Sequence, residues 1–585
     1  MNIKEYALKN KIFIAILLIV TAIALVFCFK KEGYHVDEMY SYGLANSEYL
    51  PFMHFGESGY DVKDWMNDYG AGESIGQFVQ NMIKDAKIVV KAGFKVKETE
   101  IYSKYLEAQK NSADTLTSSW VSGKEYEEYI TADKHNKFNY ASVYYNQRGD
   151  VHPPLYYIIL HTICSLTEGH FSKWTGLGIN IVCIMLALTC IYEMSKRYLG
   201  GIEAALSIVT LYGISSTIMS LTVYIRMYAL FMLITMVCML LHLRMIEKKY
   251  EISKNDYLRI GGIVLLGYLT HYYFVVYIIG LAAVFVITML VRKKFKAAIK
   301  YCLTMFASGA VGIIVWPFSI RHVFSGYRGN QAFASMKSTY SFYKLGWMVE
   351  TSVWVTLGKI GIAVLILAFI ISIVTIVMQK KKYPFEKLNA LTIPTIFSTI
   401  VVTQISPFYT EKYLMNILPF IIIIPVYILT LFVKAIQDKG VKEKNNKLNI
   451  GLIISLASFS IIIAIFNNCF FHNVMNLYEN GQETVVIEEN TDCVCVLPYG
   501  DWNETAEDSM ILAKCNKVGI VYENNIGVLK DGYKYKKGSK LLVNVAKDLD
   551  ADETLEKVKE ELGVTSLQEI KRSESAWCTR IWLAQ

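Results

Sequence analysis

The sequence predicts an α-helical polytopic membrane protein with about 11 transmembrane helices, a structured first external loop and a small external C-terminal α/β domain. Three observations lead to this fold class. Hydrophobic residues make up 53% of the 585 residues. Uncharged apolar runs long enough to cross a hydrocarbon core of about 30 Å recur along most of the chain. After Phe471 the composition changes to short strand-like runs and a charged helix.

The net charge of +8 does not indicate a nucleic-acid-binding protein. Much of the basic excess lies in short loops beside apolar runs, as in 292–294 (RKK) and 380–382 (KKK). Positive charge in such loops sets the orientation of a membrane protein, because cytoplasmic loops are enriched in Lys and Arg. We therefore expect membrane lipids around the chain and no nucleic-acid partner.

The first apolar run, 12–29, is followed by Lys30, Lys31 and Glu32 rather than by a small-residue cleavage site. It is therefore predicted to be a retained anchor and not a signal peptide. The candidate spans are 12–29, 175–194, 202–221, 227–246, 257–270, 272–290, 298–320, 353–378, 388–405, 414–433 and 448–466.

Basic residues cluster at one set of span ends, which is predicted to be cytoplasmic. The loops between them, such as those around His271 and Tyr409, then lie outside, and so does the C-terminal segment. Lys30 and Lys31 run against this pattern, but the lysines before the span and the amino terminus outweigh them. We expect a multi-pass cell-membrane protein with a cytoplasmic N-terminus. Its predicted parts are an N-terminal anchor, a first external loop, a transmembrane bundle and an external domain, over 1–32, 33–174, 175–467 and 468–585.

The first external loop is predicted to contain helices at the membrane surface. The segment 152–162 (HPPLYYIILHT) is too short for a comfortable span, and its two prolines suit a first helical turn. We expect it to be a juxtamembrane or re-entrant helix. The segment 75–86 carries apolar residues at helical spacing, which fits a helix in the membrane interface or one packed on the loop's own core.

The C-terminal segment reads as a domain of its own. Strand-like runs are expected at 484–487, 493–497, 518–522 and 540–545. A charged helix over 552–562 is predicted to end at Gly563 as a C-cap. Cys493 and Cys495 share one face of a strand, where a disulfide or a metal is an alternative to packing, although neither has the paired spacing of a zinc site.

Polar residues gather at the predicted external ends of the spans. Asp37 and Glu38 follow the first span and stand beside His35; alone, this acidic pair would be read as a solvated loop. Ionisable residues at membrane depth are costly and usually face an interior or a cavity. Five separate groups at one level therefore predict a single polar cavity. The other groups are Asp150 with His152, Arg226, His271, and Glu411 with Lys412 and Tyr413.

Five segments resemble, in the same order, motifs of the GT-C superfamily of membrane glycosyltransferases. They are HVDEMYSYGLAN (35–46), DVHPPLYY (150–157), YIRMYAL (224–230), THYYF (270–274) and SPFYTEKYLMNILP (406–419). The sequence is most similar to bacterial members related to the protein O-mannosyltransferases, which use dolichyl-phosphate mannose, and to the aminoarabinose–lipid A transferases. The resemblance covers roughly residues 1–433.

The resemblance implies a GT-C-like fold and a hexosyl- or pentosyltransferase of the cell envelope. Its donor would be a polyprenyl-phosphate-linked sugar, and its acceptor a hydroxyl on a protein, a lipid or a cell-wall glycan. An external enzyme has no access to cytoplasmic nucleotide sugars, and the sequence has no glycine-rich phosphate loop. Transfer would be an inverting displacement on the external face of the membrane.

The resemblance also implies roles for single residues. Asp37 resembles the base that deprotonates the acceptor, and Glu38 would orient acceptor or donor. Arg226 resembles the residue that pairs with the donor phosphate. Lys412 stands where relatives often carry Arg, so it keeps the charge but loses bidentate geometry. Tyr413 is expected beside it.

Further contacts are expected from the same motifs. His35, Tyr228 and Tyr272 are expected to bind substrate. Asp150, His152 and His271 could hold a divalent metal ion, because similar positions lie near a metal in the aminoarabinose transferases. The alternative is that the two histidines hydrogen-bond the donor or the loop backbone. No cofactor is required by the sequence.

Two other functions compete with this prediction. A transporter or flippase of lipid-linked sugars would also have many spans and buried charges. Transporters, however, often show repeated halves and midplane polar groups, whereas this sequence shows no repeat and its charges cluster at one face. A non-catalytic receptor or scaffold would leave Asp37, Glu38 and Arg226 unexplained.

Overall fold

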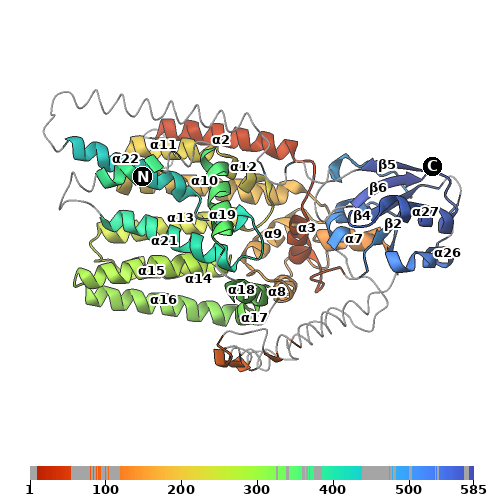
Figure 1. Cartoon of the computed structure of the whole chain (residues 1–585), viewed down its shortest axis with the longest axis horizontal. Coiled ribbons are helices and arrows are strands. Elements are labelled where there is room, and N and C mark those ends of the chain that lie inside the picture. Colours follow the sequence, from red (N-terminus) through yellow and green to blue (C-terminus); the bar gives the residue numbers. More distant parts are fainter. Residues whose placement is uncertain are drawn as a thin grey trace.

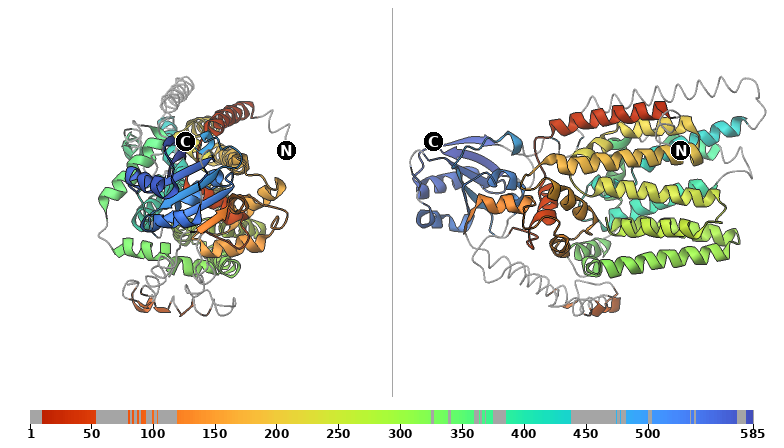
Figure 2. Two further views of the ribbon diagram at one scale, coloured as in Figure 1. Left: turned by 90° about the vertical axis from the view of Figure 1, so that its right-hand side faces the viewer. Right: turned by 180° about the vertical axis from the view of Figure 1, so that it is seen from behind.

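The computed structural model describes residues 10–53, 119–324, 327–337, 341–358, 385–437, 482–499, 503–533, 539–571 and 579–584, with scattered positions between them. Long helices lie side by side at one end of the molecule and a β-sheet lies at the other (Figure 1). Short helices, including α3 and α9, fill the space between them. The view from behind shows the same order, with the red and orange segments between bundle and sheet (Figure 2).

Six helices in the described part of the chain are long and apolar enough to cross a membrane, or seven if one bent pair is a single span. The six are α2 (Lys11–Lys30), α10 (Lys173–Met194), α13 (Tyr228–Glu247), α15 (Tyr273–Val291), α16 (Phe295–Val315) and α21 (Phe385–Ile405). The bent pair is α11 (Ile202–Gly213) and α12 (Ser216–Val223), which meet at 57°. The protein is therefore a helical multi-pass membrane protein, as predicted.

Three predicted spans differ from the structure. The run 202–221 is not one straight helix, because Ser215 begins a new helix by accepting a hydrogen bond from the Ile218 amide. The run 257–270 forms α14 (Lys254–Tyr268), which is short for a span. The run 414–433 is divided between the 3₁₀ turn η3 (Glu411–Leu414) and α22 (Pro419–Gln437), since a proline suits the first turn of a new helix.

The total of about 11 spans stays a prediction. The run 353–378 lies largely outside the described residues, and the run 448–466 lies wholly outside them. Most of the amphipathic run 75–86 is also outside.

Short helices lie between the bundle and the sheet, and two of them, α3 and α9, carry polar motifs. They are α3 (Val36–Asn46), α7 (Gly123–Ile130), α8 (Tyr140–Gly149) and α9 (Leu155–Leu166). Further helices, α17 (Phe318–Phe324), α18 (Tyr327–Lys337) and α19 (Phe342–Leu357), lie beside the long helices. The predicted helix after the two prolines is α9, which starts directly after Pro154. Its first amide donates to the Leu269 carbonyl, so the loop after α14 fixes where α9 begins.

The C-terminal segment forms a mixed six-stranded sheet with the order β1-β3-β2-β4-β6-β5. Its strands are β1 (Ser119–Ser122), β2 (Asp492–Leu497), β3 (Lys517–Tyr522), β4 (Leu541–Ala546), β5 (Leu567–Lys571) and β6 (Thr579–Ala584). The central strands β3, β2 and β4 are parallel, and the outer ones pair antiparallel. The predicted helix is α27 (Ala551–Leu562), and Gly563 ends it with φ 68°.

One predicted strand was wrong. The run 484–487 follows the 3₁₀ turn η5 (Gln482–Thr484) and is not a strand, because this stretch contacts the chain before α3 instead of a sheet edge. Cys493 and Cys495 do share a face, with their sulfurs 3.9 Å apart. Both are free and buried, so they pack as small apolar side chains.

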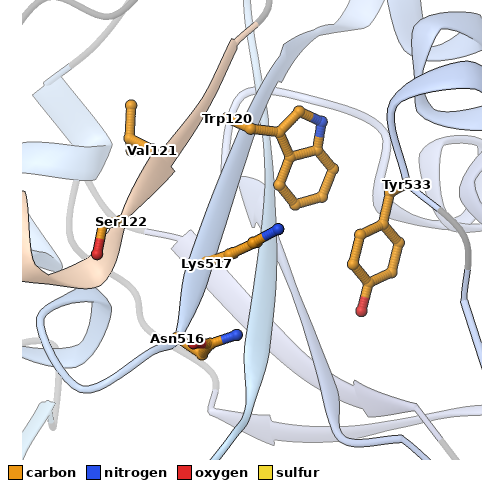
Figure 3. Close-up of a pocket in the computed structure, with 6 residues that line it drawn as sticks. All are labelled: Trp120, Val121, Ser122, Asn516, Lys517 and Tyr533. Carbon is orange, nitrogen blue, oxygen red and sulfur yellow. The ribbon is translucent and has the colours of Figure 1, made fainter.

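The edge strand β1 comes from the first loop, which the sequence did not predict. The Trp120 ring lies over Gly519 on β3 and stacks on Tyr533, with ring centroids 4.9 Å apart (Figure 3). These rings border a cavity of about 470 Å³ that also includes Asn516 and Lys517. The first loop and the C-terminal segment are thus parts of one folded unit.

Gly123, the first residue of α7, tests this packing. A Cβ atom there would lie 1.9 Å from the Cys515 carbonyl oxygen, so Gly123→Ala requires the backbone to move. We expect a loss of about 1–3 kcal/mol in the free energy of unfolding, as for other overpacked sites. Thermal unfolding of the full chain measures it. Gly346→Ala on α19 is the control, because a Cβ there meets no atom within 4 Å; equal stability of the two variants would contradict the close approach.

Candidate active site

The acidic motif begins a helix through its own side chains. The His35 ring accepts a hydrogen bond from the Asp37 amide, and the Glu38 carboxylate accepts one from the His35 amide, which together form a capping box. This arrangement satisfies amides that a helix start leaves without partners. Asp37 and Glu38 therefore occupy the first turn of α3, where carboxylates are favoured by the helix dipole.

Asp37 lies at the centre of a small charged cluster. Its Oδ2 accepts hydrogen bonds from the Tyr224 hydroxyl at 2.6 Å and from Lys412 Nζ at 2.9 Å. Its Oδ1 lies 3.7 Å from Arg226 Nη2. The Asp37 side chain keeps 26% of its surface exposed, whereas that of Arg226 keeps 5%. The carboxylate can therefore be reached by a ligand, although two cations already face it.

Arg226 is held from several sides. It lies in the turn between α12 and α13, where Asn180 of α10 donates to the carbonyls of Thr222 and Tyr224. Its Nη1 donates to Ser41 at 3.3 Å and to the Tyr157 hydroxyl at 3.1 Å. Its Nε is buried and has no hydrogen-bond partner among the described residues. One donor of the guanidinium is thus not used by the part of the chain that the structure describes.

Lys412 reaches the cluster from η3. Thr410 caps this turn by accepting from the Lys412 amide, and the Lys412 ammonium lies 5.8 Å from the ring centres of Tyr224 and Tyr413. Tyr228 stacks on Tyr224 with ring centroids 5.8 Å apart. Aromatic faces around an ammonium stabilise its charge. Lys412 and the rings of Tyr224, Tyr228 and Tyr413 therefore lie together on one side of the site.

The ionisation of the motif follows from this geometry. Burial would raise the pKa of Asp37, but Lys412 and Arg226 hold it well below its usual value. Burial lowers the pKa of His35 to about 4, against the opposing effect of Asp37. At neutral pH Asp37 is therefore ionised and His35 is neutral. The neutral ring is the form whose Nδ1 can accept the Asp37 amide.

Glu38 faces away from this cluster. Its Oε2 accepts from Lys31 Nζ at 3.1 Å, and both side chains are fully buried. Its Oε1 accepts from the Ile225 amide at 2.9 Å. Every contact the structure gives this carboxylate is to the protein itself. The geometry therefore favours a positioning role for Glu38 over the predicted contact with acceptor or donor.

A second polar group is formed by Asp150, His152 and His271. The Nδ1–H of His152 donates to Asp150 at 2.9 Å, and the ring centroids of His152 and His271 are 5.8 Å apart. Burial would raise the pKa of Asp150, yet His152 lowers it to about 2. Burial lowers the pKa of His271, whose Nδ1 accepts the Tyr273 amide, so its Nε2 carries the proton; this buried Nε2 has no partner in the part of the chain that the structure describes.

The predicted metal site is not supported by these positions. Among the described residues, no group of three or more His, Cys, Asp or Glu side chains is arranged to hold a metal ion. The Nδ1 atoms of both histidines are bonded, to Asp150 and to the Tyr273 amide. We therefore assign no chemical step to a metal.

Tyr272 belongs to a different group. Its hydroxyl accepts from the Trp316 indole at 3.0 Å and pairs with His322 at 2.8 Å. These bonds join Tyr272 to Trp316 and α17 and not to Asp37, and its predicted substrate contact stays a prediction. The remaining predicted residues, from five parts of the chain, do come together around Asp37 and Asp150.

A comparison with protein families gives this site a context. Residues 151–318 match the sequence model of the family described as dolichyl-phosphate-mannose-protein mannosyltransferase. The matched segment, which covers less than a third of the chain, is similar to that family. The matched segment includes His152, Arg226 and His271 but not Asp37 or Lys412. A comparison with curated proteins gave no match.

Two solved structures of ArnT from Cupriavidus metallidurans are similar to this chain. The structure bound to undecaprenyl phosphate has 11% identity and a TM-score of 0.40, over 74% of this chain and 87% of that chain. The apo structure has 10% identity and a TM-score of 0.44, over 83% of this chain and 97% of that chain. With TM-scores below 0.5, these likenesses carry no argument about the site.

Three contacts of the candidate site were missed from the sequence, although each had a signal. Tyr224 stands two residues before Arg226 in the YIRMYAL motif, and Tyr157 stands in the DVHPPLYY motif. Lys31 was noted only as a charge at the wrong end of a span. The structure explains that charge, because Lys31 is the buried partner of Glu38.

Glu38→Gln tests the positioning role. This change leaves Lys31 buried without its carboxylate, which typically costs about 3–5 kcal/mol. We expect the free energy of unfolding to fall accordingly, and the double variant Lys31→Met/Glu38→Gln to recover most of it. Reversible unfolding of the full chain in mixed micelles measures both. A Glu38→Gln protein with wild-type stability but no activity would instead make Glu38 part of the chemistry.

The pKa of His35 predicts a pH dependence of stability. An unfolded histidine titrates near about 6.5, whereas His35 in the fold titrates at about 4. Between these values the unfolded state binds more protons, so stability falls as the pH is lowered. Asn can cap a helix without titrating. We therefore expect His35→Asn to gain in melting temperature relative to wild type as the pH falls through this range; parallel curves for the two proteins would contradict it.

Proposed function

We propose that the protein transfers a sugar from a polyprenyl-phosphate-linked donor to an acceptor hydroxyl, by inverting displacement with Asp37 as the base. The observation that carries the proposal is the meeting of one accessible carboxylate with two cations from separate parts of the chain, Arg226 and Lys412. Transfer from such a donor needs a base for the acceptor and positive charge for the departing phosphate.

The donor phosphate would bind Lys412 and Arg226. Lys412 offers a point charge on a flexible stem, and Arg226 offers the buried Nε–H that has no partner among the described residues. A phosphate oxygen supplies the missing acceptor. Stabilising the negative charge that grows on the phosphate as the sugar leaves then lowers the barrier.

Donor binding would also turn Asp37 into a better base. In the free protein, Lys412 and Arg226 keep the pKa of Asp37 low, and a strongly stabilised carboxylate accepts a proton poorly. A phosphate that shares these cations weakens their hold on Asp37, so its basicity rises when the donor is in place. The site would therefore activate the acceptor only beside a bound donor.

The polar group around Asp150 would hold the sugar. His271 presents a buried Nε2–H that has no partner among the described residues, and its ring lies near that of His152. A sugar hydroxyl is an acceptor that could complete it. The acceptor would be a hydroxyl of a protein, a lipid or a cell-wall glycan on the external face of the membrane, a side that the charge pattern of the loops favours.

Asp37→Asn separates catalysis from donor binding. Removing the base should lower sugar transfer by about 10²–10⁴-fold. It should leave the affinity for undecaprenyl phosphate, used as a sugar-free probe, equal or higher, because Asn no longer competes for the two cations. Transfer is measured with radiolabelled polyprenyl-phosphate hexose or pentose and an envelope fraction as acceptor.

The matched comparisons are Arg226→Ala and Lys412→Met. Each should lower the affinity for undecaprenyl phosphate by about tenfold or more, because a charged hydrogen bond is lost. Unchanged transfer by Asp37→Asn would remove it as the base. Movement of lipid-linked sugar across reconstituted vesicles without transfer would instead favour a flippase.

A further inference from the structure

The turn η5, which precedes β2, is hydrogen-bonded to the chain just before Asp37 and Glu38. Gln482 of η5 is fully buried, and its side-chain amide pairs with one residue in both directions. Its Oε1 accepts from the Tyr34 amide at 2.9 Å, and its Nε2 donates to the Tyr34 carbonyl at 3.0 Å. This two-point contact fixes both the position and the rotation of the Tyr34 peptide groups.

Neighbouring bonds extend the same contact. The Glu483 amide donates to the Glu32 carbonyl, and the Glu32 amide donates to the Leu477 carbonyl. The Glu483 carboxylate accepts from the Tyr34 hydroxyl at 2.7 Å and from Lys173 Nζ at 2.8 Å. Glu32 and Tyr34 are therefore both bonded to a segment far away in the sequence.

This contact lies two residues before the first turn of α3. His35 directly follows Tyr34, and its ring and backbone set the start of the helix through the capping box. Asp37 stands in that first turn, at hydrogen-bond distance from Lys412 and Tyr224. A shift of the Tyr34 peptide moves the cap, and with it the Asp37 carboxylate relative to its cations.

We propose that Gln482 is a positioning residue for Asp37, through which the C-terminal segment sets the geometry of the active site. The functional part of this inference rests on the proposed role of Asp37. A base must lie within hydrogen-bond reach of the proton it removes, and a misplacement of about 1 Å can cost a hundredfold in rate. Gln482 touches no reacting group and acts only through the peptide of Tyr34.

Hydrogen–deuterium exchange of full-length protein in lipid nanodiscs tests the positioning directly. Gln482→Met keeps the length of the side chain but removes both bonds to Tyr34. We expect faster exchange in the peptide that spans Tyr34 and the first turn of α3, with unchanged exchange in β2 and β4. Glu569→Gln, which alters a partly exposed pair with Arg580 in the same sheet, is the control and should leave the Tyr34 peptide as in wild type.

Activity gives the second readout. For Gln482→Met we expect the transfer rate to fall by about tenfold to a hundredfold, with the affinity for undecaprenyl phosphate unchanged. Gln482→Glu adds a pH signature: a protonated carboxyl can both accept and donate, and burial raises the pKa of a carboxyl. Its rate relative to wild type should recover as the pH is lowered from about 8 to about 5.5, whereas that of Gln482→Met should not.

The outcomes are separable. Unchanged exchange at Tyr34 in Gln482→Met, or faster exchange throughout the sheet, overturns the positioning role whatever the enzyme does. Faster exchange confined to Tyr34 and α3 supports it even if the wild-type protein transfers no sugar, a result that would overturn the proposed function alone. Wild-type transfer by a Gln482→Met protein with a loosened α3 overturns the link to Asp37.

Discussion

The arrangement of the site depends on the buried carboxylate of Glu38. It joins three parts of the chain, because it accepts from Lys31 at the end of α2, from the His35 amide at the start of α3 and from the Ile225 amide beside Arg226. Burying two opposite charges away from water costs free energy, but burying one of them without the other costs far more. The first membrane helix, the acidic helix and the arginine turn are therefore held at fixed relative positions.

Because Glu38 holds these parts together, the neighbouring carboxylate of Asp37 can face the site. Successive residues on a helix point about 100° apart, so Glu38 can face inward while Asp37 faces the site. Asp37 shares its face of α3 with Ser41, one turn later, and both contact Arg226. Two adjacent acids of similar chemistry thus differ completely in surroundings, one enclosed by amides and a lysine, the other partly open between two cations.

The sequence predicted the parts of this structure that depend on local pattern. Long apolar runs gave most of the described membrane helices, alternating Val and Cys gave β2, and Gly563 gave the end of α27. All three of Asp37, Arg226 and Lys412 lie at the predicted external ends of spans, and this was enough to group them. The sequence could not show that β1 joins a distant sheet, because four residues of edge strand carry too little pattern to indicate a partner.

The same limit applies to single side chains. Only the fold decides which way a side chain points, so the sequence could not show that Glu38 is enclosed while Asp37 is partly exposed. The bend between α11 and α12 depends on one serine cap inside an apolar run, where hydropathy is uniform. Gln482 carried no signal at all, because a single glutamine in a polar stretch looks like any solvated residue.

The pairing of Tyr34 with Gln482 bridges 448 positions of the chain. A ribosome therefore makes the acidic motif long before it makes the side chain that holds it, and nearly all the membrane helices are synthesised in between. Until that late segment emerges and folds back, the turn that carries Asp37 lacks the contact with Gln482. A partly inserted chain in the membrane therefore has the acidic motif but not yet its final alignment.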